Sequence, residues 1–334
     1  MRRSTPSAIL FWLAGSTLSA QATPSPALLA LSKTDLTLAI VNPATNAVVA
    51  RMPSGPDPHE VVASADGRFA YISNYGGGAY NTLTVVDLVD QKTVETIDLG
   101  ALRGPHGLAF VAGKVWFTAE AAKAIGSYDP ATKKIDFVLG TGQNRTHMVW
   151  VSADARRIVT SDVNTATITI IDRLSAPAGR GGMGPDWDEV HIPVGRGSEG
   201  FDVTPDGKEI WVANAGDGTI SVIDAGTKKV AQTLTANVLG ANRLEITPDG
   251  KLALVSSLRL PDLVIFDVAT RREIKRLSIG RGAAGIEIQP DGARAYVACT
   301  PDDYIVVIDL KSRAVVGHID AGKQPDGLAW AVRR

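Results

Sequence analysis

The chain of 334 residues has a single cysteine, Cys299. One thiol excludes an internal disulfide and any zinc or iron–sulfur site that needs several cysteines. The CxxCH motif that attaches a c-type haem is missing as well. We therefore expect no haem and no covalent cross-link to hold the fold together.

An excess of charge of either sign is also missing. The chain has 34 Lys and Arg against 35 Asp and Glu, a formal net charge of −1. A balanced charge gives the whole molecule no electrostatic attraction for nucleic acid or anionic membrane. We expect neither as a partner, and we expect a monomer.

Several well-known catalytic motifs are absent, including GxSxG, HExxH and the Walker lysine motif. Two segments, 195–200 and 280–285, do match GxGxxG. Each lies between two predicted strands with no helix after it, so neither is a dinucleotide site. We expect no nucleotide cofactor.

Long apolar runs are confined to the N-terminus. Arg2 and Arg3 precede the run AILFWLAG at 8–15, which is too short to span a bilayer. Ala20-Gln21-Ala22 then forms a small-x-small cleavage pattern. This order predicts a signal peptide over 1–22, cleaved after Ala22, and a periplasmic or secreted mature chain over 23–334 without a membrane span. A buried or membrane-anchoring N-terminal helix is the alternative.

The rest of the chain is a repeat array. Its units begin at PDPHEVV, GPHGLAF, RTHMVWV, GSEGFDV, ANRLEIT, GAAGIEI and QPDGLAW, spaced by 41 to 52 residues. Each unit contains short runs rich in β-branched and aromatic residues, such as KEIWVAN and TISVIDA, separated by turns such as PDG. A period near forty with four short strands per unit is typical of a β-propeller.

The blade count follows from the ends of the array. Six units are complete, the seventh supplies one strand, and ALLALSK, LTLAIVN and AVVARMP near the N-terminus supply three. We predict an all-β, seven-bladed propeller with four-stranded antiparallel blades, in which the last strand completes the N-terminal blade and covers both open edges. Six or eight blades are the alternative counts. An insertion at 173–189 lies between third and fourth strands, as a disordered tip or a partner contact.

The repeats resemble a known family. YISN at 71–74, WVAN at 211–214 and YVAC at 296–299, followed by SVID or VVID, are similar to the YVTN-type, YncE-like β-propeller repeats. The second unit, with PHGLAF at 105–110 and VWFTAE at 115–120, resembles repeats of streptogramin B lyases. That second resemblance implies a metal in the propeller channel.

Two rings of residues should meet at one mouth of the channel, because a blade's first strand starts on the face where its second strand ends. The first ring is predicted as His59, His106, His147, Glu199, Arg243, Ala284 and Asp326. The second is predicted as Asn74, Glu120, Asp162, Asn214, Ser257, Cys299 and Ser32.

Three of the chain's five histidines thus fall at equivalent positions of consecutive blades. We predict His59, His106 and His147 as ligands of a divalent metal, since imidazole and carboxylate suit zinc, manganese or iron. Glu199, as base or fourth ligand, and Glu120 and Asp162, as acid/base or orienting groups, are predicted catalytic residues. The alternative is that each histidine is structural.

A basic rim adds a second expectation. Arg103 and Arg196 lie in loops that lead into first strands, and Arg243 falls in the ring. We predict that these arginines, with Asn74 and Asn214, bind a small anionic ligand. A solvated charged rim is the alternative.

Two functions remain open. The first is an exported, metal-dependent hydrolase, lactonase or lyase acting on a small anionic molecule. The second is a non-catalytic ligand- or protein-binding propeller, as the YVTN-type resemblance also allows.

Overall fold

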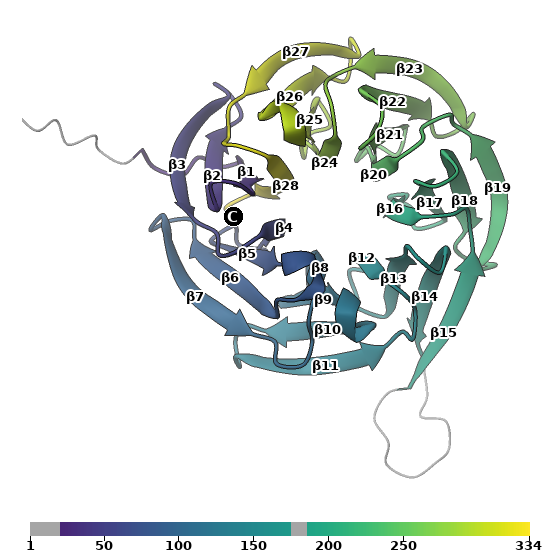
Figure 1. Cartoon of the computed structure of the whole chain (residues 1–334), viewed down its shortest axis with the longest axis horizontal. Coiled ribbons are helices and arrows are strands. Elements are labelled where there is room, and N and C mark those ends of the chain that lie inside the picture. The colour runs from purple at the N-terminus through teal and green to yellow at the C-terminus, as the bar shows by residue number, and fades with distance from the viewer. Residues whose placement is uncertain (1–20, 175–185) are drawn as a thin grey trace, which may run out of the picture.

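The computed structural model describes residues 21–174 and 186–334. These residues form seven four-stranded antiparallel sheets, arranged as blades around a central channel (Figure 1). The predicted seven-bladed propeller is therefore confirmed. The predicted signal peptide falls, except for its last two residues, outside the described ranges. Within those ranges, no helix combines the length and the apolar character needed to cross a membrane.

Each blade runs from the channel outward in chain order, except that β28 takes the inner place in blade seven. Blade one contains β4 (Pro58–Ala63), β5 (Phe69–Asn74), β6 (Thr82–Asp87) and β7 (Lys92–Asp98). Blade two contains β8 (Pro105–Val111), β9 (Lys114–Ala119), β10 (Ala124–Asp129) and β11 (Lys134–Gly140). Blade three contains β12 (Thr146–Val151), β13 (Arg157–Asp162), β14 (Thr167–Arg173) and β15 (Trp187–Pro193). Blade four contains β16 (Ser198–Val203), β17 (Glu209–Asn214), β18 (Thr219–Asp224) and β19 (Lys229–Thr235). Blade five contains β20 (Ala241–Ile246), β21 (Leu252–Ser257), β22 (Asp262–Asp267) and β23 (Arg272–Ser278). Blade six contains β24 (Ala283–Ile288), β25 (Arg294–Cys299), β26 (Tyr304–Asp309) and β27 (Ala314–Ile319). Blade seven contains β28 (Pro325–Ala331), β1 (Ala27–Ser32), β2 (Thr37–Asn42) and β3 (Ala47–Pro53). Three short 3-10 turns complete the elements: η1 (Gly76–Gly78), η2 (Glu120–Ala122) and η3 (Thr300–Asp302).

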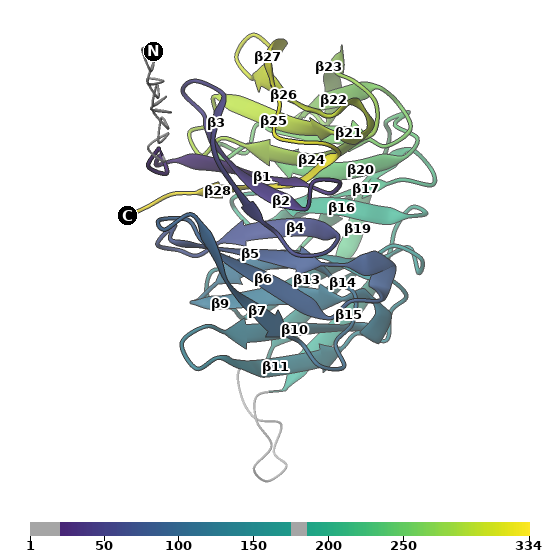
Figure 2. The same ribbon diagram turned by 60° about the vertical axis from the view of Figure 1, so that its left-hand side comes forward.

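The two ends of the chain close the ring, as the blade count predicted. β28 pairs with β1, with Ala27 opposite Ala331 and Leu28 opposite Trp330 (Figure 2). Ser25 and Arg333 are also joined by hydrogen bonds just outside this pair. The pairing gives backbone partners to two strands that would otherwise present open edges.

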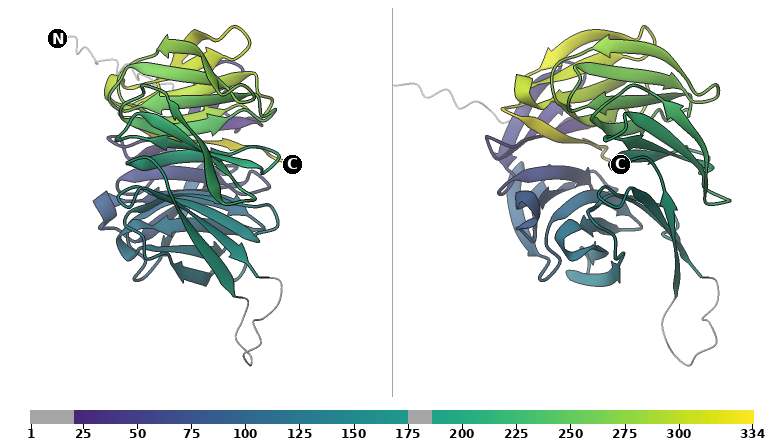
Figure 3. Two further views of the ribbon diagram at one scale, coloured as in Figure 1. Left: turned by 90° about the vertical axis from the view of Figure 1, so that its right-hand side faces the viewer. Right: turned by 45° about the vertical axis from the view of Figure 1, so that its right-hand side comes forward.

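The core lies between neighbouring blades. The second and third strands carry nearly continuous apolar runs, such as LAIV in β2 and IVVI in β26, because both faces of these strands pack against another blade. The outermost strands are largely exposed, and β11 alternates exposed and half-buried residues along its whole length. Figure 3 shows the blades edge-on as twisted sheets.

The insertion lies between β14 and β15, the third-to-fourth strand connection where it was predicted. Its bounds are narrower than 173–189, because Arg173 ends β14 and Trp187 begins β15. The connecting segment between them extends over 174–186, of which 175–185 fall outside the described ranges.

The innermost strands approach one another very closely on the channel side. Gly107 in β8 lies so near β12 that a Cβ atom built on it would be 2.7 Å from the carbonyl oxygen of His147. Gly327 in β28 would meet the carbonyl oxygen of His59 at 2.4 Å. Glycine at these positions therefore sets the spacing of the strands that carry the histidines.

Candidate functional site

The second residue of each innermost strand faces the channel mouth. His59, His106, His147 and Glu199 occupy this position in β4, β8, β12 and β16, and Asp326 occupies it in β28. Ala284 holds the same position in β24, so six of the seven residues predicted for the first ring occupy it, and the five polar ones belong to consecutive blades around the channel. The structure places them together, as the repeat alignment predicted.

A β-bulge near the start of each of these strands aims the ring residues. In blade one, for example, Pro58 pairs with Asn74 and Val61 with Ile72, so His59 and Glu60 stand opposite the single residue Ser73. The Ser73 hydroxyl accepts a hydrogen bond from the Glu60 backbone N–H, at 3.0 Å. A bulge of this kind redirects side chains that a regular strand would send to alternate faces.

Hydroxyl groups also fix the ring residues from the preceding blade. Thr118 donates to the backbone carbonyl of His147 at 2.7 Å, and Ser161 donates to that of Glu199 at 2.6 Å. Both hydroxyls lie one residue before the end of a second strand. Short buried bonds of this type hold the backbone under the ring in one position.

The three histidines form a contiguous row. The ring centroids of His59 and His106 are 4.2 Å apart, and those of His106 and His147 are 3.8 Å apart. His106 is fully buried, and neither of its ring nitrogens has a hydrogen-bond partner among the described residues. Burial, and then the neighbouring His147 and His59, hold the pKa of His106 well below its usual range. A neutral, unpartnered imidazole is the state in which histidine binds a metal.

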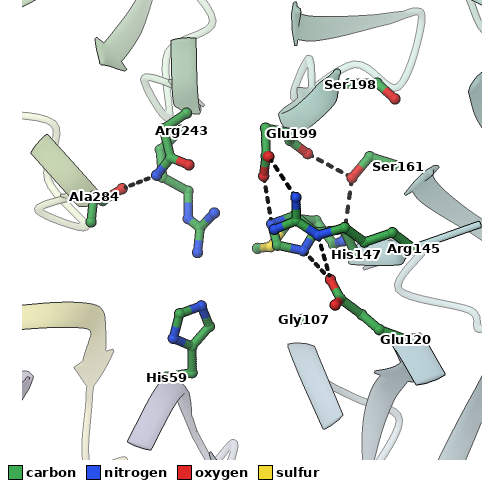
Figure 4. A network of polar contacts seen from close by, with 12 residues as sticks. His59, Gly107, Glu120, Arg145, His147, Ser161, Ser198, Glu199, Arg243 and Ala284 are labelled. Atoms are coloured by element: carbon green, nitrogen blue, oxygen red, sulfur yellow. Dashed lines mark hydrogen bonds and ion pairs between the residues drawn. The ribbon is translucent and has the colours of Figure 1, made fainter. Parts of the chain in front are cut away.

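His147 is clamped between two carboxylates (Figure 4). Its Nδ1 lies 2.5 Å from Glu120 and its Nε2 lies 2.8 Å from Glu199. Arg145 adds a 3.0 Å contact to Glu199, and the Tyr75 hydroxyl donates to the second oxygen of Glu120. Burial alone would lower the pKa of His147, but the bonds to Glu120 and Glu199 outweigh it and the pKa is raised.

His59 is held from the other side of the ring. Its Nδ1 lies 2.9 Å from the Asp326 carboxylate, and Lys33 stands between Asp326 and Asp57 at 3.4 and 3.0 Å. Burial would raise the pKa of Asp326, but His59 and then Lys33 and Arg243 bring it down to about 2. Asp326 is therefore a carboxylate that orients the His59 ring.

The predicted triad does not converge on one point. Donor atoms gather into two groups within 4.8 Å, one made by His59, Glu60 and His106 and the other by His106, Glu120 and His147. His59 and His147 share no group, because they lie on either side of His106. The expectation of one ion held by all three histidines is corrected to two adjacent donor sets that share His106.

Glu120 reaches the histidine cluster because it lies one residue beyond the strand end at which the repeat alignment placed it. The strand register puts Ala119 opposite Pro105, just as Asn74 lies opposite Pro58. Glu120 therefore follows the strand end by one residue, at the start of η2. Because successive side chains of a strand point to opposite faces, this single step turns Glu120 toward the histidines.

The other predicted residues of the second ring turn away from the channel. Asn74 donates to Thr82 and Thr84, and Asn214 donates to Thr219 and Ser221, all inside their own blades. Their assignment to ligand binding is corrected to a structural position that joins second and third strands.

Asp162 occupies the same internal position in blade three. Its carboxylate accepts hydrogen bonds from Thr169 at 2.7 Å and Thr167 at 3.3 Å. Complete burial raises its pKa to about 6, although these hydroxyls partly oppose the shift. Its predicted role beside the histidines is corrected in the same way.

Arg243 lies one residue beyond the ring position, which Asn242 occupies in β20. The guanidinium is nonetheless in the channel, where it pairs with Glu60 of the blade across the ring. Figure 4 shows Arg243 and His59 facing Glu199 and Arg145 across an open space. Arg243 is thus the one arginine of the predicted rim that reaches the histidine cluster.

Arg103 and Arg196 do not line this space. Arg196 is exposed and bound to Asp217 at 2.7 Å, and Arg103 is exposed in its loop. Their predicted contact with substrate is corrected to an outer-rim position, where surface ion pairs contribute little.

A cavity of about 370 Å³ opens at this mouth. Three cations line it, Lys33, Arg145 and Arg243, together with His59, His147, Glu199 and Asp326. Leu258, Ala284 and Pro301 form an apolar wall. Sequence reasoning missed Lys33, Tyr75 and Arg145; the first two directly follow the end of a second strand, the same position as Glu120.

A second cavity of about 450 Å³ lies farther along the channel, and Arg243 lines both. Asp202, Glu245 and Glu287 face it from the fifth position of β16, β20 and β24. Burial raises the pKa of Glu287 to about 8 and that of Asp202 to about 6. The two ends of the channel therefore differ in chemistry, with histidines and cations at one and carboxylates at the other.

The geometry defines a seven-bladed β-propeller with a polar, cation-lined pocket at one mouth. Residues 183–329 match the model of the YNCE-like β-propeller family, in agreement with the resemblance of the repeats in this part of the chain. A sequence search of curated proteins finds no match.

Solved structures share the fold at low identity. A protein of unknown function from Desulfotomaculum acetoxidans superposes with a TM-score of 0.76 at 13% identity, covering 93% of this chain and 100% of its own. A candidate 6-phosphogluconolactonase from Bacteroides fragilis gives 0.73 at 18%, with 93% and 99% covered. Dihydro-heme d1 dehydrogenase NirN gives 0.65 at 17%, with 92% and 75% covered. At these identities the likeness concerns the fold alone.

Proposed function

We propose that the protein is an exported, metal-dependent enzyme that hydrolyses an ester or lactone of a small anionic molecule. The observation that carries the proposal is His106, a fully buried imidazole with two unpartnered nitrogens between two further histidines and beside Glu120 and Glu60. A purely structural histidine would use its nitrogens in hydrogen bonds, because leaving them buried and unpaired is costly.

The ligand set is suited to the reaction. A divalent zinc, manganese or iron ion bound by imidazole and carboxylate would polarise the substrate carbonyl and lower the pKa of bound water. Within the chain, the pair formed by His147 and Glu199 can hold or release a proton at Nε2, and Arg145 keeps Glu199 in place. Tyr75 fixes Glu120 by donating to its second oxygen.

The cavity is suited to an anion. Three cations, Lys33, Arg145 and Arg243, are among its lining residues. Guanidinium groups bind carboxylate and phosphate with paired hydrogen bonds. The apolar wall at Leu258 and Pro301 would contact the uncharged part of the substrate. The Bacteroides fragilis structure that shares the fold is named for a phosphorylated lactone, so such lactones are included among the substrates to be tested.

Metal content and activity test the proposal together. We expect the mature, untagged protein to bind divalent metal, measured by elemental mass spectrometry, and to hydrolyse members of a panel of anionic lactones and esters. His106→Ala should lose both properties. His318→Ala is the matched control, because His318 is exposed on the outer strand β27 and should keep both.

A protein that stays metal-free after incubation with zinc, manganese and iron would overturn the metal-dependent reaction. The non-catalytic propeller would then be favoured, and binding of the same anions without turnover would support it. Elimination products in place of hydrolysis products would instead identify a lyase.

A further inference from the structure

We infer that His106 bridges two divalent metal ions, each bound by one of its ring nitrogens. The inference rests on the proposed function and adds the number and arrangement of the ions. Its basis is the division of the donors into two groups that share only His106. Both nitrogens of this ring are buried and have no hydrogen-bond partner in residues 21–174 and 186–334, so neither has to give up a bond seen there.

The first ion would be bound by His59, Glu60 and His106. Nδ1 of His59 is already engaged, since it lies 2.9 Å from Asp326 and 2.6 Å from Nζ of Lys33, which leaves Nε2 as the metal-binding nitrogen. A carboxylate behind a histidine is the usual support for a metal ligand. Glu60 bonds Arg243 through Oε1, and its second oxygen is available to the ion.

The second ion would be bound by His106, Glu120 and His147. It would take the place of the proton now shared between Glu120 and Nδ1 of His147, which are 2.5 Å apart. Glu199 at 2.8 Å from Nε2 then stands behind His147, as Asp326 stands behind His59. The two donor sets therefore have the same plan: a carboxylate ligand, a histidine ligand and a carboxylate that orients the histidine.

The shared ring must lose its remaining N–H proton to bind both ions. Binding of both ions would thus release two protons to solvent: the N–H proton of His106, whose ring becomes an imidazolate, and the proton now held between Glu120 and His147. The positive charge of the two ions would stabilise the imidazolate, since each ring nitrogen would then face a cation. Each ion has three protein donors, so each keeps a position for water or for an oxygen of the substrate.

Stoichiometry tests the bridge on the full mature chain, stripped of metal and dialysed against zinc. We expect two zinc ions per wild-type chain, one in Glu60→Gln, one in Glu120→Gln and none in His106→Ala. Glu245→Gln is the matched control, since Glu245 lies in the far cavity, and it should keep two.

Folding of Glu60→Gln needs its own safeguard, because the substitution leaves Arg243 without its partner. The double variant Glu60→Gln/Arg243→Met removes both charges and should also bind one ion. Refilling the wild type with cobalt(II) should give two ions whose electron paramagnetic resonance signal is weakened by coupling through the shared ring.

The outcomes separate this inference from the proposed function. One zinc per wild-type chain, unchanged by Glu60→Gln, would overturn the bridge and leave a mononuclear enzyme. Two cobalt ions without coupling would also overturn the bridge. No bound metal at all would overturn both.

Discussion

At the scale of the residue, Asp162 shows that one position of the repeat can be filled by a carboxylate or by an amide. It takes the position that Asn74 and Asn214 hold in other blades, and it uses the same pair of hydroxyl partners on the third strand. Burial raises the pKa of Asp162 to about 6, so its charged form is disfavoured in the folded protein. An amide meets the same hydrogen-bonding need without that cost.

Asp162→Asn should therefore stabilise the protein at neutral pH. A carboxyl with a raised folded-state pKa loses stability as pH increases from its unfolded value, near 4, to about 6. The advantage of the variant should be small at pH 4, grow to pH 6 and stay constant above it, at up to about 3 kcal/mol. Urea unfolding at several pH values measures this, and metal content should not change. A variant less stable than the wild type at pH 8 would show that the carboxylate is needed.

At the scale of the element, the innermost strands depend on glycine where they cross the histidine cluster. Gly107→Ala should destabilise the fold and weaken metal binding, because its Cβ would press on the backbone of His147 and Met148 at 2.7 Å. Overpacking of this kind costs about 1–3 kcal/mol. Calorimetry and zinc titration measure the two effects.

Gly140→Ala is the control for this change, because Gly140 also lies in a strand but a Cβ there meets no atom within 4 Å. Its melting temperature should equal that of the wild type. Equal melting temperatures for both variants would mean that β8 and β12 can move apart without cost.

At the scale of the whole molecule, stability depends on closure of the ring by β28. A chain that ends at Lys323 lacks the inner strand of blade seven and leaves one edge of β1 unpaired, although β1 still pairs with β2 on its other edge. We expect this truncated chain to aggregate, as seen by light scattering, since uncovered strand edges pair with other chains. Deletion of Arg334 alone should leave a monomer. If the truncated chain stays monomeric with an unchanged thermal transition, the six complete blades are sufficient for a stable fold.

The fold was predictable from sequence because the same pattern of strands and turns recurs in every repeat. An uncertain strand in one repeat can therefore be assigned by comparison with the other copies. The site was less predictable, because it depends on single-residue register. Glu120 and Ala119 were confused, as were Arg243 and Asn242, since a repeat alignment tolerates a shift of one residue and a strand does not. The bulge that turns His59 and Glu60 toward the channel leaves no sequence signal of its own.

Other features of the site were visible in the sequence but were not used in the prediction. Asp202, Glu245 and Glu287 recur at one position of three consecutive blades, in the same way as the histidines. Lys33 and Tyr75 occupy the position of Glu120 in their blades, and comparing that column would have found them. The contact of Arg145 with Glu199, by contrast, depends on a loop conformation in which Arg145 has a φ of 63°. No pattern in the sequence indicates this conformation.

The pairing of Ala27 with Ala331 also determines when the propeller can close during synthesis. During synthesis the ribosome releases β1 early and β28 last, so the first strand waits for its partner until almost the whole chain has been made. Contacts between the two ends of a chain form slowly, because a long loop has to close first. Every nascent chain therefore passes through an open ring with one edge of β1 unpaired, and a chain that stopped before β28 would remain in that state.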